Sequence, residues 1–328
     1  MLLVGSMEPL TLDEEAMGKK LGIPAVRADL ERIQIPDVAT LLSLQVLSSP
    51  RTAEYAGGGP LNAEEKPLLE YWAPRAFYAD RGANDINRFD ERRTFGGSSI
   101  LLKERIESKP LTDDERLHIG LLHGDASRGN ALIGYSMLAD YLSRHPRDVG
   151  VLEVMADLVE RVGRSEEHLK YRERLAGLKP NDPVVLEKYA WALFSDERPL
   201  SSAFAPFDAS VPERLLKRCV ELSGDTVDYY HARLGDIYFR TQQFRAALES
   251  YSRALKIRED YDSDPRLRQD ALLLQLAKCL RHLGDNGRAA GYALQAANIN
   301  PRNEEARDFI YLIWTVGNTT PRDSSKAR

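Results

Sequence analysis

The six histidines and two cysteines are the residues best suited to hold a metal or to act as nucleophile or base, and they are scattered along the chain. His118 and His123 are five residues apart, whereas a helical metal-binding pair has its ligands four residues apart on one face. Cys219 and Cys279 lie among apolar residues far from each other, which favours two small core residues in a reducing compartment over a disulfide. The sequence therefore predicts no zinc site, and no cofactor is expected.

Two glycine-rich segments could be imagined as phosphate or anion sites. Gly57-Gly58-Gly59 follows no predicted strand, and Pro60 removes an amide donor that a phosphate would need. The run at 96–99, Gly-Gly-Ser-Ser, is better interpreted as a linker that ends in a serine helix cap. With no Ser, His and Asp pattern either, the sequence predicts that this chain alone is not an enzyme.

Composition excludes several classes of partner. The net charge is −5 and the pI about 5.8, which gives no basic footprint for nucleic acid. No apolar run approaches the ~20 residues that a membrane helix needs, and Met1-Leu2-Leu3-Val4 is too short for a signal peptide. A cytoplasmic protein with a protein or peptide partner is the expectation.

Helical hairpins are the elements that must position any functional residue, and residues 226–260 show the unit most clearly. Two apolar stripes at helical spacing flank a short polar turn at 240–243. Gly235 and Ala247 are small enough to let two antiparallel helices approach, while Tyr238 and Tyr251 supply bulk where the pair is wider. Substituting Gly235 by Leu is therefore expected to force the pair apart.

This order of small and large residues resembles the tetratricopeptide repeat, which recurs every 34 residues. The matching positions are His231-x2-Leu234-Gly235-x2-Tyr238, then Ala247-x3-Tyr251 and Ala254, with His in place of Trp and Glu259 in place of Pro. The resemblance implies an α-solenoid whose first helices line a concave groove that binds other proteins. The Lys-and-Asn clamp of chaperone-binding members is absent at the matching positions.

Further copies follow by register. They begin at Leu152, Leu186 and Leu273, and a degenerate copy spans 112–145. Met155 and Tyr189 are 34 residues apart, as are Pro146 and Pro180. Two stretches break the period: a loop at 195–210 that carries Phe204, which we expect to fill a gap between hairpins, and about eight extra residues near 258–268, expected as a longer second helix. Residues 304–316 are expected to form a terminal helix.

The N-terminal part carries a second resemblance. Gly59-Pro60-Leu61-Asn62 and the residues up to Tyr71, closed by Ala73-Pro74-Arg75, look like the C-terminal end of spermidine synthase-like proteins. The resemblance covers about residues 1–80 and implies a strand at 2–6 followed by helices at 11–21, 28–33 and 36–47. The cofactor-binding loop and catalytic Asp of that family would lie upstream, so no catalytic residue is carried over.

The predicted fold class is mainly α, an α-solenoid of antiparallel helix hairpins with a small α/β remnant at the N-terminus. The predicted domains are 1–80, the spermidine synthase-like segment; 81–111, a linker with a short helix; 112–316, the solenoid; and 317–328, a disordered tail.

Polar residues of the first helices that face away from the second helices are the candidate groove. By register they are Glu153, Asp157, Glu160, Glu187, Trp191, Tyr229, Asp236, Arg240, Lys278 and Arg281. Each alone is more often part of a solvated helix face. Two functions remain open: a non-catalytic interaction scaffold that binds a peptide or partner domain, and the C-terminal portion or docking subunit of an aminopropyltransferase-like enzyme whose catalytic chain is separate.

Overall fold

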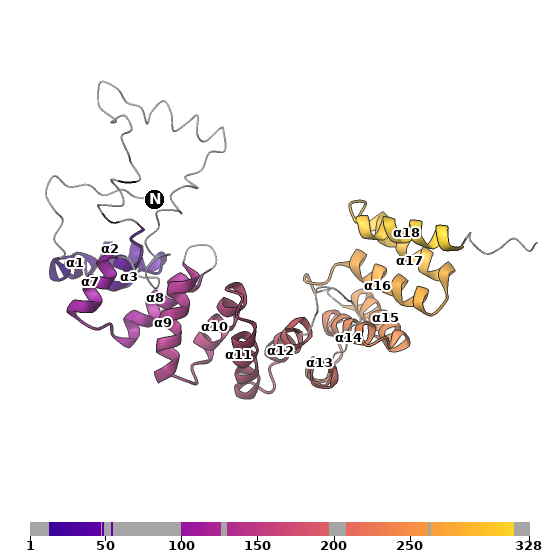
Figure 1. The fold of residues 1–328 in the computed structure, drawn as a ribbon, viewed down its shortest axis with the longest axis horizontal. Coiled ribbons are helices and arrows are strands. Elements are labelled where there is room, and N and C mark those ends of the chain that lie inside the picture. The colour runs from indigo at the N-terminus through magenta and orange to yellow at the C-terminus, as the bar shows by residue number, and fades with distance from the viewer. Residues whose placement is uncertain are drawn as a thin grey trace, which may run out of the picture. The chain divides into compact units, whose positions relative to one another are not determined.

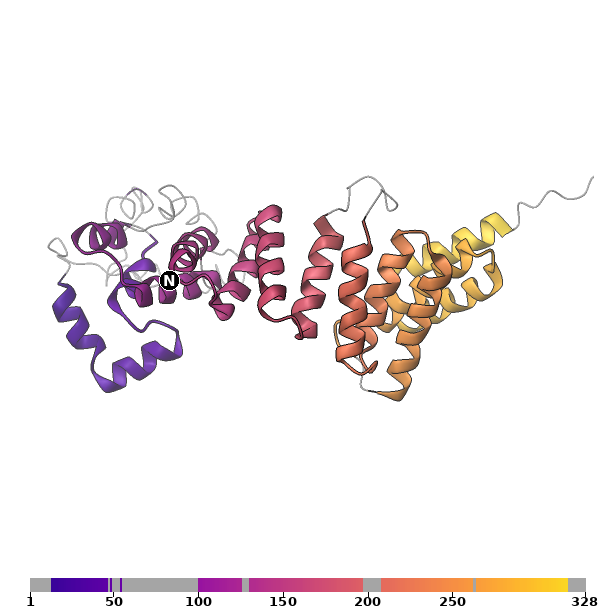
Figure 2. The same ribbon diagram turned by 90° about the horizontal axis from the view of Figure 1, so that it is seen from below.

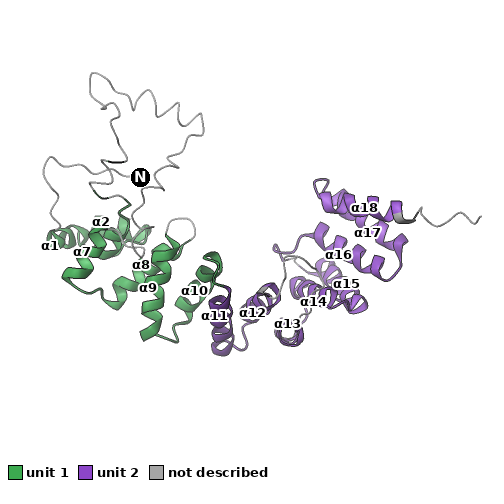
Figure 3. Ribbon diagram, viewed as in Figure 1, with its two compact units in different colours: residues 1–164 green, residues 165–328 purple. Residues whose placement is uncertain are grey.

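The computed structural model describes residues 13–46, 48, 54, 100–125, 130–196, 208–261 and 264–317 (Figure 1). Every helix or strand in these ranges is an α-helix, which confirms the mainly α class with helices packed in adjacent pairs. The strand predicted at 2–6 lies outside the described residues. The chain divides into two compact units, residues 1–164 and 165–328, which are taken one at a time (Figure 3).

Unit 1 begins with three short helices and continues with longer ones. They are α1 (Glu14–Leu21), α2 (Pro24–Arg32), α3 (Val38–Ser43), α7 (Ile100–Ser108), α8 (Asp113–Gly124), α9 (Ala131–Arg144) and α10 (Val149–Arg161). The helix predicted from residue 11 begins at Glu14, where the Asp13 side chain accepts a hydrogen bond from the backbone N–H of Ala16 at 2.9 Å. The carboxylate of Asp13 caps this helix because its short side chain reaches the free amides of the first turn.

A buried arginine ties the helices of unit 1 together. The Arg105 side chain is fully buried, and its Nε lies 2.7 Å from Glu14 Oε1 while its Nη2 lies 3.0 Å from Glu115 Oε1. It also donates to the backbone carbonyl of Lys109. A buried guanidinium is tolerated only where carboxylates and carbonyls take up its donors, so Arg105 fixes α7 against α1 and α8.

The degenerate repeat predicted at 112–145 is the hairpin of α8 and α9. Thr112 and Glu115 form the predicted capping box, in which each side chain bonds the backbone N–H of the other residue. The two helices cross closely: a Cβ added at Gly134 would lie 2.8 Å from the backbone N of Gly124. Glycine is required there because the neighbouring backbone leaves no room for a side chain.

Unit 2 is a succession of paired helices, which the view turned by 90° also shows (Figure 2). They are α11 (Ser165–Leu178), α12 (Pro183–Asp196), α13 (Ser210–Leu222), α14 (Asp228–Arg240), α15 (Phe244–Asp260), α16 (Gln269–His282), α17 (Asn286–Ile299) and α18 (Glu304–Gly317). The pairs α12–α13, α14–α15 and α16–α17 are the predicted hairpins, and α18 is the predicted terminal helix. The predicted copy that begins at Leu152 corresponds to α10 and α11, one in each unit.

The α14–α15 pair confirms that Gly235 lies at a tight contact between the helices, but the prediction that Tyr251 lies where the pair is wider is wrong, because its ring packs on Gly235. A Cβ at Gly235 would lie 2.5 Å from Cε1 of Tyr251, a ring that is 1% exposed and is packed in the core of unit 2. The Tyr251 hydroxyl donates to Asp236 Oδ1 at 2.8 Å, which fixes the ring against the glycine. The absence of a side chain at Gly235 therefore makes room for the Tyr251 ring.

The two irregular stretches differ in outcome. The extra residues near 258–268 lengthen α15 only as far as Asp260, and residues 261 and 264–268 are not helical, so the prediction of a longer helix is correct for part of the insertion. Phe204, in the other stretch, lies outside the described residues. Of the predicted tail at 317–328, Gly317 ends α18 and the rest also lies outside them. The predicted domain boundaries stay predictions.

Candidate ligand-binding face of unit 2

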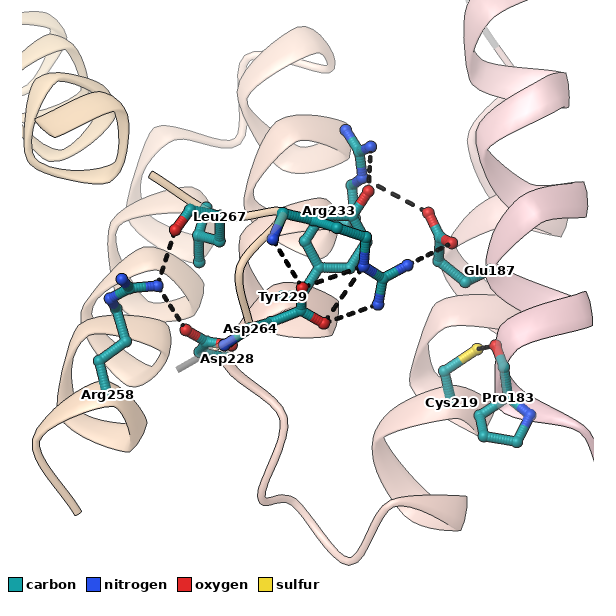
Figure 4. A network of polar contacts seen from close by, with 10 residues as sticks. Pro183, Glu187, Cys219, Asp228, Tyr229, Arg233, Arg258, Asp264 and Leu267 are labelled. Atoms are coloured by element: carbon teal, nitrogen blue, oxygen red, sulfur yellow. Dashed lines mark hydrogen bonds and ion pairs between the residues drawn. The ribbon is translucent and has the colours of Figure 1, made fainter. Parts of the chain in front are cut away.

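Four of the predicted groove residues converge in unit 2. Glu187 and Trp191 come from α12, and Tyr229 and Asp236 from α14. They meet around Arg233, a residue of α14 that was not among the predicted groove residues. Figure 4 shows Glu187 and Tyr229 beside Arg233. We call Glu187, Trp191, Tyr229, Arg233, Asp236 and Arg266 the arginine–aromatic cluster.

The Arg233 guanidinium lies flat against aromatic rings. Its Cζ is 3.3 Å from the centroid of the Trp191 ring and 4.6 Å from that of Tyr229, and it donates to the Tyr229 hydroxyl. Stacking occupies the faces of the guanidinium and leaves its in-plane N–H groups for hydrogen bonds. Two of these nitrogens make no short hydrogen bond: Nε is buried without a hydrogen-bond partner, and Nη1 is 3.6 Å from Asp236 Oδ2.

Arg266 enters the cluster from the connection between α15 and α16. Its guanidinium lies 4.0 Å from the Tyr229 ring centroid, and three N–H···O contacts of 2.7–3.2 Å join it to the Asp264 carboxylate. These hydrogen bonds raise the pKa of Arg266. The insertion between repeats thus places a second cation against the Tyr229 ring, which Arg233 also contacts.

Glu187 lies between the two arginines and is almost fully buried. Its Oε1 is 3.5 Å from Arg233 Nε, and its Oε2 is 3.5 Å from Arg266 Nη1. Burial raises the pKa of Glu187, and the charges of the two arginines offset this only in part. At such long separations each ion pair lacks a short hydrogen bond, so the carboxylate is held in a costly environment.

The other predicted residues of this unit are engaged within the fold. Arg240 is buried, and its Nη1 donates to the carbonyl of Phe194 at 2.5 Å. Lys278 Nζ lies 2.6 Å from Glu305 Oε1 of α18, and Arg281 lies over the Phe309 ring at 5.6 Å from its centroid. Lys278 and Arg281 are therefore both in contact with the last described helix.

The three predicted residues of unit 1 share one face of α10. Glu153 is half-buried, whereas Asp157 and Glu160 are exposed, and their spacing of four and three residues keeps them aligned. They form an acidic strip on that helix.

A cavity of about 770 Å³ opens beside the N-terminal part of α16. It is lined by Arg268, Asp270, Ala271, Leu274, Gln275, Ile299, Asn300, Arg302, Asn303, Glu304 and Glu305. Burial would raise the pKa of Asp270, but hydrogen bonds from Arg268, Asn300 and Asn303 outweigh it and lower the pKa to about 2. Because these donors come from the chain itself, the carboxylate is fully used in holding the α17–α18 turn against α16.

One pair of side chains in unit 1 has the composition of a nucleophile and its base. His123 Nε2 lies 2.9 Å from Ser43 Oγ, and both side chains are buried. The backbone N–H of Asn130 donates to His123 Nδ1 at 3.1 Å, so the proton of a neutral ring is on Nε2. The imidazole therefore donates toward Ser43 and cannot take the proton of its hydroxyl, which makes the pair a structural link between α3 and α8.

The cysteines and histidines give no sign of metal chemistry in the described ranges, where no group of three or more His, Cys, Asp or Glu is placed to hold an ion. Cys219 and Cys279 are buried and free, and burial raises the pKa of each thiol to about 12. Thiols of this kind are poor nucleophiles at neutral pH. Among the helices that the structure describes, none is both long and apolar enough to cross a bilayer.

Comparisons with known proteins bear on the helix pairs. Several solved structures are similar: MamA, from residue 41 to its end, of Desulfovibrio magneticus RS-1 (12% identity, 58% of this chain and 96% of that one, TM-score 0.47); TTC0263, a thermophilic TPR protein of Thermus thermophilus (15%, 62% and 100%, 0.39); and PilF of Pseudomonas aeruginosa (14%, 74% and 96%, 0.45). No curated protein matched the chain.

A family model also matches. Residues 225–302 match the tetratricopeptide repeat, and this range contains α14, α15, α16 and α17. The match does not extend to residues 1–80, where the spermidine synthase-like resemblance lies. The helix pairs α14–α15 and α16–α17 are therefore similar to the tetratricopeptide repeat.

Proposed function

We propose that this chain is a non-catalytic scaffold that binds a peptide segment or a partner domain on the first-helix face of unit 2. Tetratricopeptide-type helix pairs suggest a role in protein–protein interaction. The arginine–aromatic cluster is the place on this face where a ligand would gain the most binding free energy. The observation that carries the proposal is the unused hydrogen-bonding capacity of Arg233.

The physical reason lies in how a stacked guanidinium is satisfied. Arg233 has five N–H donors, of which the Tyr229 hydroxyl accepts one. A carbonyl of an extended peptide could accept from the Nη1 group, while Trp191, which is half-buried, would contact an apolar side chain next to that carbonyl. Binding of this kind replaces long ion pairs by short hydrogen bonds.

The test is quantitative affinity capture with the full chain as bait. Arg266→Glu changes a side chain that is 42% exposed in the cluster, and Arg288→Glu changes one that is 65% exposed on α17 and serves as the matched control. We expect partners bound by the native chain to be lost with Arg266→Glu and retained with Arg288→Glu. Retention of every partner by both variants would contradict binding at the cluster. Arg240 is unsuitable as a probe because its side chain is buried.

A second proposal rests on the resemblance of residues 59–75 to spermidine synthase-like proteins. In it, the chain would be the C-terminal portion of such an enzyme or would dock on a separate catalytic chain. Isothermal titration with decarboxylated S-adenosylmethionine tests the non-catalytic assignment, because tight binding by this chain alone would contradict it. We further propose a cytoplasmic location, which the free and buried thiols of Cys219 and Cys279 support.

A further inference from the structure

The last described helix, α18, has the register of a first helix of a hairpin. In α14 and α16 the small residues Gly235 and Ala277 face the helix that follows and are buried by it. The corresponding residue of α18, 34 positions after Ala277, is Tyr311, whose side chain is 72% exposed. Figure 1 shows α18 packed beside α17 at the outer edge of unit 2.

The outer face of α18 carries a continuous stripe of large side chains. Arg307, Tyr311 and Trp314 are spaced by four and three residues and so share one side of the helix. Trp314 is 62% exposed and the Arg307 side chain 56%, while Ala306, Phe309 and Ile313 are buried on the inner side. Exposed aromatic residues in such a stripe are typical of a surface that a protein covers.

The identity of the occupant follows from the order of residues in the stripe. The midpoint between Arg307 and Trp314 falls next to Tyr311, so an antiparallel copy of α18 places Arg307 of each chain against Trp314 of the other, with the two Tyr311 rings near the axis. A two-fold interface requires this property, because residue i must contact residue j and j must contact i. The arrangement gives two cation–π contacts for one symmetric pairing.

Other occupants fit less well. A second helix that crosses α18 as closely as α15 crosses α14 needs a small residue at position 311, where tyrosine stands. Residues 318–328 of this sequence contain no apolar side chain apart from Pro321 and Ala327, so they offer little to cover an aromatic stripe. We propose that the outer face of α18 pairs two copies of this chain in antiparallel orientation.

Sedimentation velocity of the full chain over about 1–100 µM tests the proposal, since weak homodimers dissociate in this range. We expect a concentration-dependent dimer. Trp314→Lys should raise the dissociation constant on the order of 10-fold or more, because it removes an aromatic anchor and opposes Arg307 with a like charge. Leu132→Lys, at a side chain on α9 that is 49% exposed, is the control and should leave the dimer unchanged.

The orientation has its own test. The double variant Arg307→Glu with Trp314→Lys places opposite charges against each other in the antiparallel pair, so it should dimerise more tightly than Trp314→Lys alone. A wild-type chain that is monomeric at every concentration would overturn the proposal. So would a dimer that Trp314→Lys does not weaken, a double variant that is no tighter than the single one, or a dimer that forms only after removal of residues 318–328. All substituted side chains are exposed, and circular dichroism should show that each variant keeps its helices.

Discussion

Replacing Gly235 by alanine tests the close crossing on which the repeat pattern depends. The added Cβ would lie 2.5 Å from Cε1, 2.6 Å from Cδ1 and 2.8 Å from Cζ of Tyr251. Three ring atoms inside 3 Å mean that the ring must move, and a moved ring gives up the 2.8 Å hydrogen bond from its hydroxyl to Asp236. The substitution therefore acts on packing and on a buried polar contact together.

The magnitude follows from three contributions. Alanine gains about 1 kcal/mol over glycine in a helix interior. Overpacking costs about 1–3 kcal/mol, and loss of a hydrogen bond to a charged group costs about 1.5–3 kcal/mol. The net expectation for Gly235→Ala is a loss of about 1.5–5 kcal/mol in the free energy of unfolding, whereas helix propensity alone would raise that free energy. Gly235→Leu should lose more, since a longer side chain enters the same contact.

Chemical unfolding followed by circular dichroism measures this difference. Gly291→Ala is the matched control, because Gly291 is also helical and an added Cβ there meets nothing within 4 Å. It should gain up to about 1 kcal/mol. Tyr251→Phe isolates the hydrogen bond to Asp236 and should lose less than Gly235→Ala. If Gly235→Ala were as stable as Gly291→Ala, the close crossing of α14 and α15 would be refuted.

Three further predictions concern buried charges and thiols. Glu187→Gln should become increasingly more stable than the native chain as the pH rises above about 4.5, the ordinary pKa of this group. Burial raises the folded-state pKa of Glu187, so the native chain loses stability as the carboxyl ionises, whereas glutamine does not ionise. A difference in unfolding free energy between the two chains that is the same at pH 4 and pH 7 would contradict this. Arg105→Ala should cost about 3–5 kcal/mol of unfolding free energy by stranding Glu14 and Glu115, whereas Arg32→Ala, at an 80% exposed side chain, should show no measurable change. Cys219 and Cys279 should react with a thiol reagent at neutral pH only in denaturant, and rapid reaction of the folded chain would show that they are not buried thiols of high pKa.

The hairpins could be predicted because their signal is local. Gly235, Leu234 and Tyr238 lie on one helix, and a contact repeated every 34 residues leaves the same spacing in each copy. The terminal helix follows from the same register and is present, and the turn before α17 has Gly284 at a φ of +85°. Glycine at such a turn is expected because few other residues adopt a positive φ.

The arginine–aromatic cluster could be predicted only in part. Register selected Glu187, Trp191 and Tyr229, since these positions repeat. It missed Arg233, whose position was not among those taken to face the groove, and Arg266, which belongs to an insertion with no counterpart in other repeats. A residue in an insertion is placed by tertiary contacts alone, here by Asp264 and the Tyr229 ring, so sequence periodicity holds no information on it.

The buried carboxylates at the starts of α14 and α16 have a consequence for how the chain can be shortened. Asp228 accepts from Arg258 and from the backbone N–H of Asp264, and Asp270 accepts from Asn300 and Asn303. Each helix start is thus completed by residues that come roughly thirty positions later in the chain. A truncation after α17, at Ile299, would remove both asparagines and leave Asp270 with Arg268 as its remaining side-chain donor among those named above. Each of these helix pairs is completed by residues of the connection that follows it, so a cut at an apparent boundary removes contacts from the pair that remains.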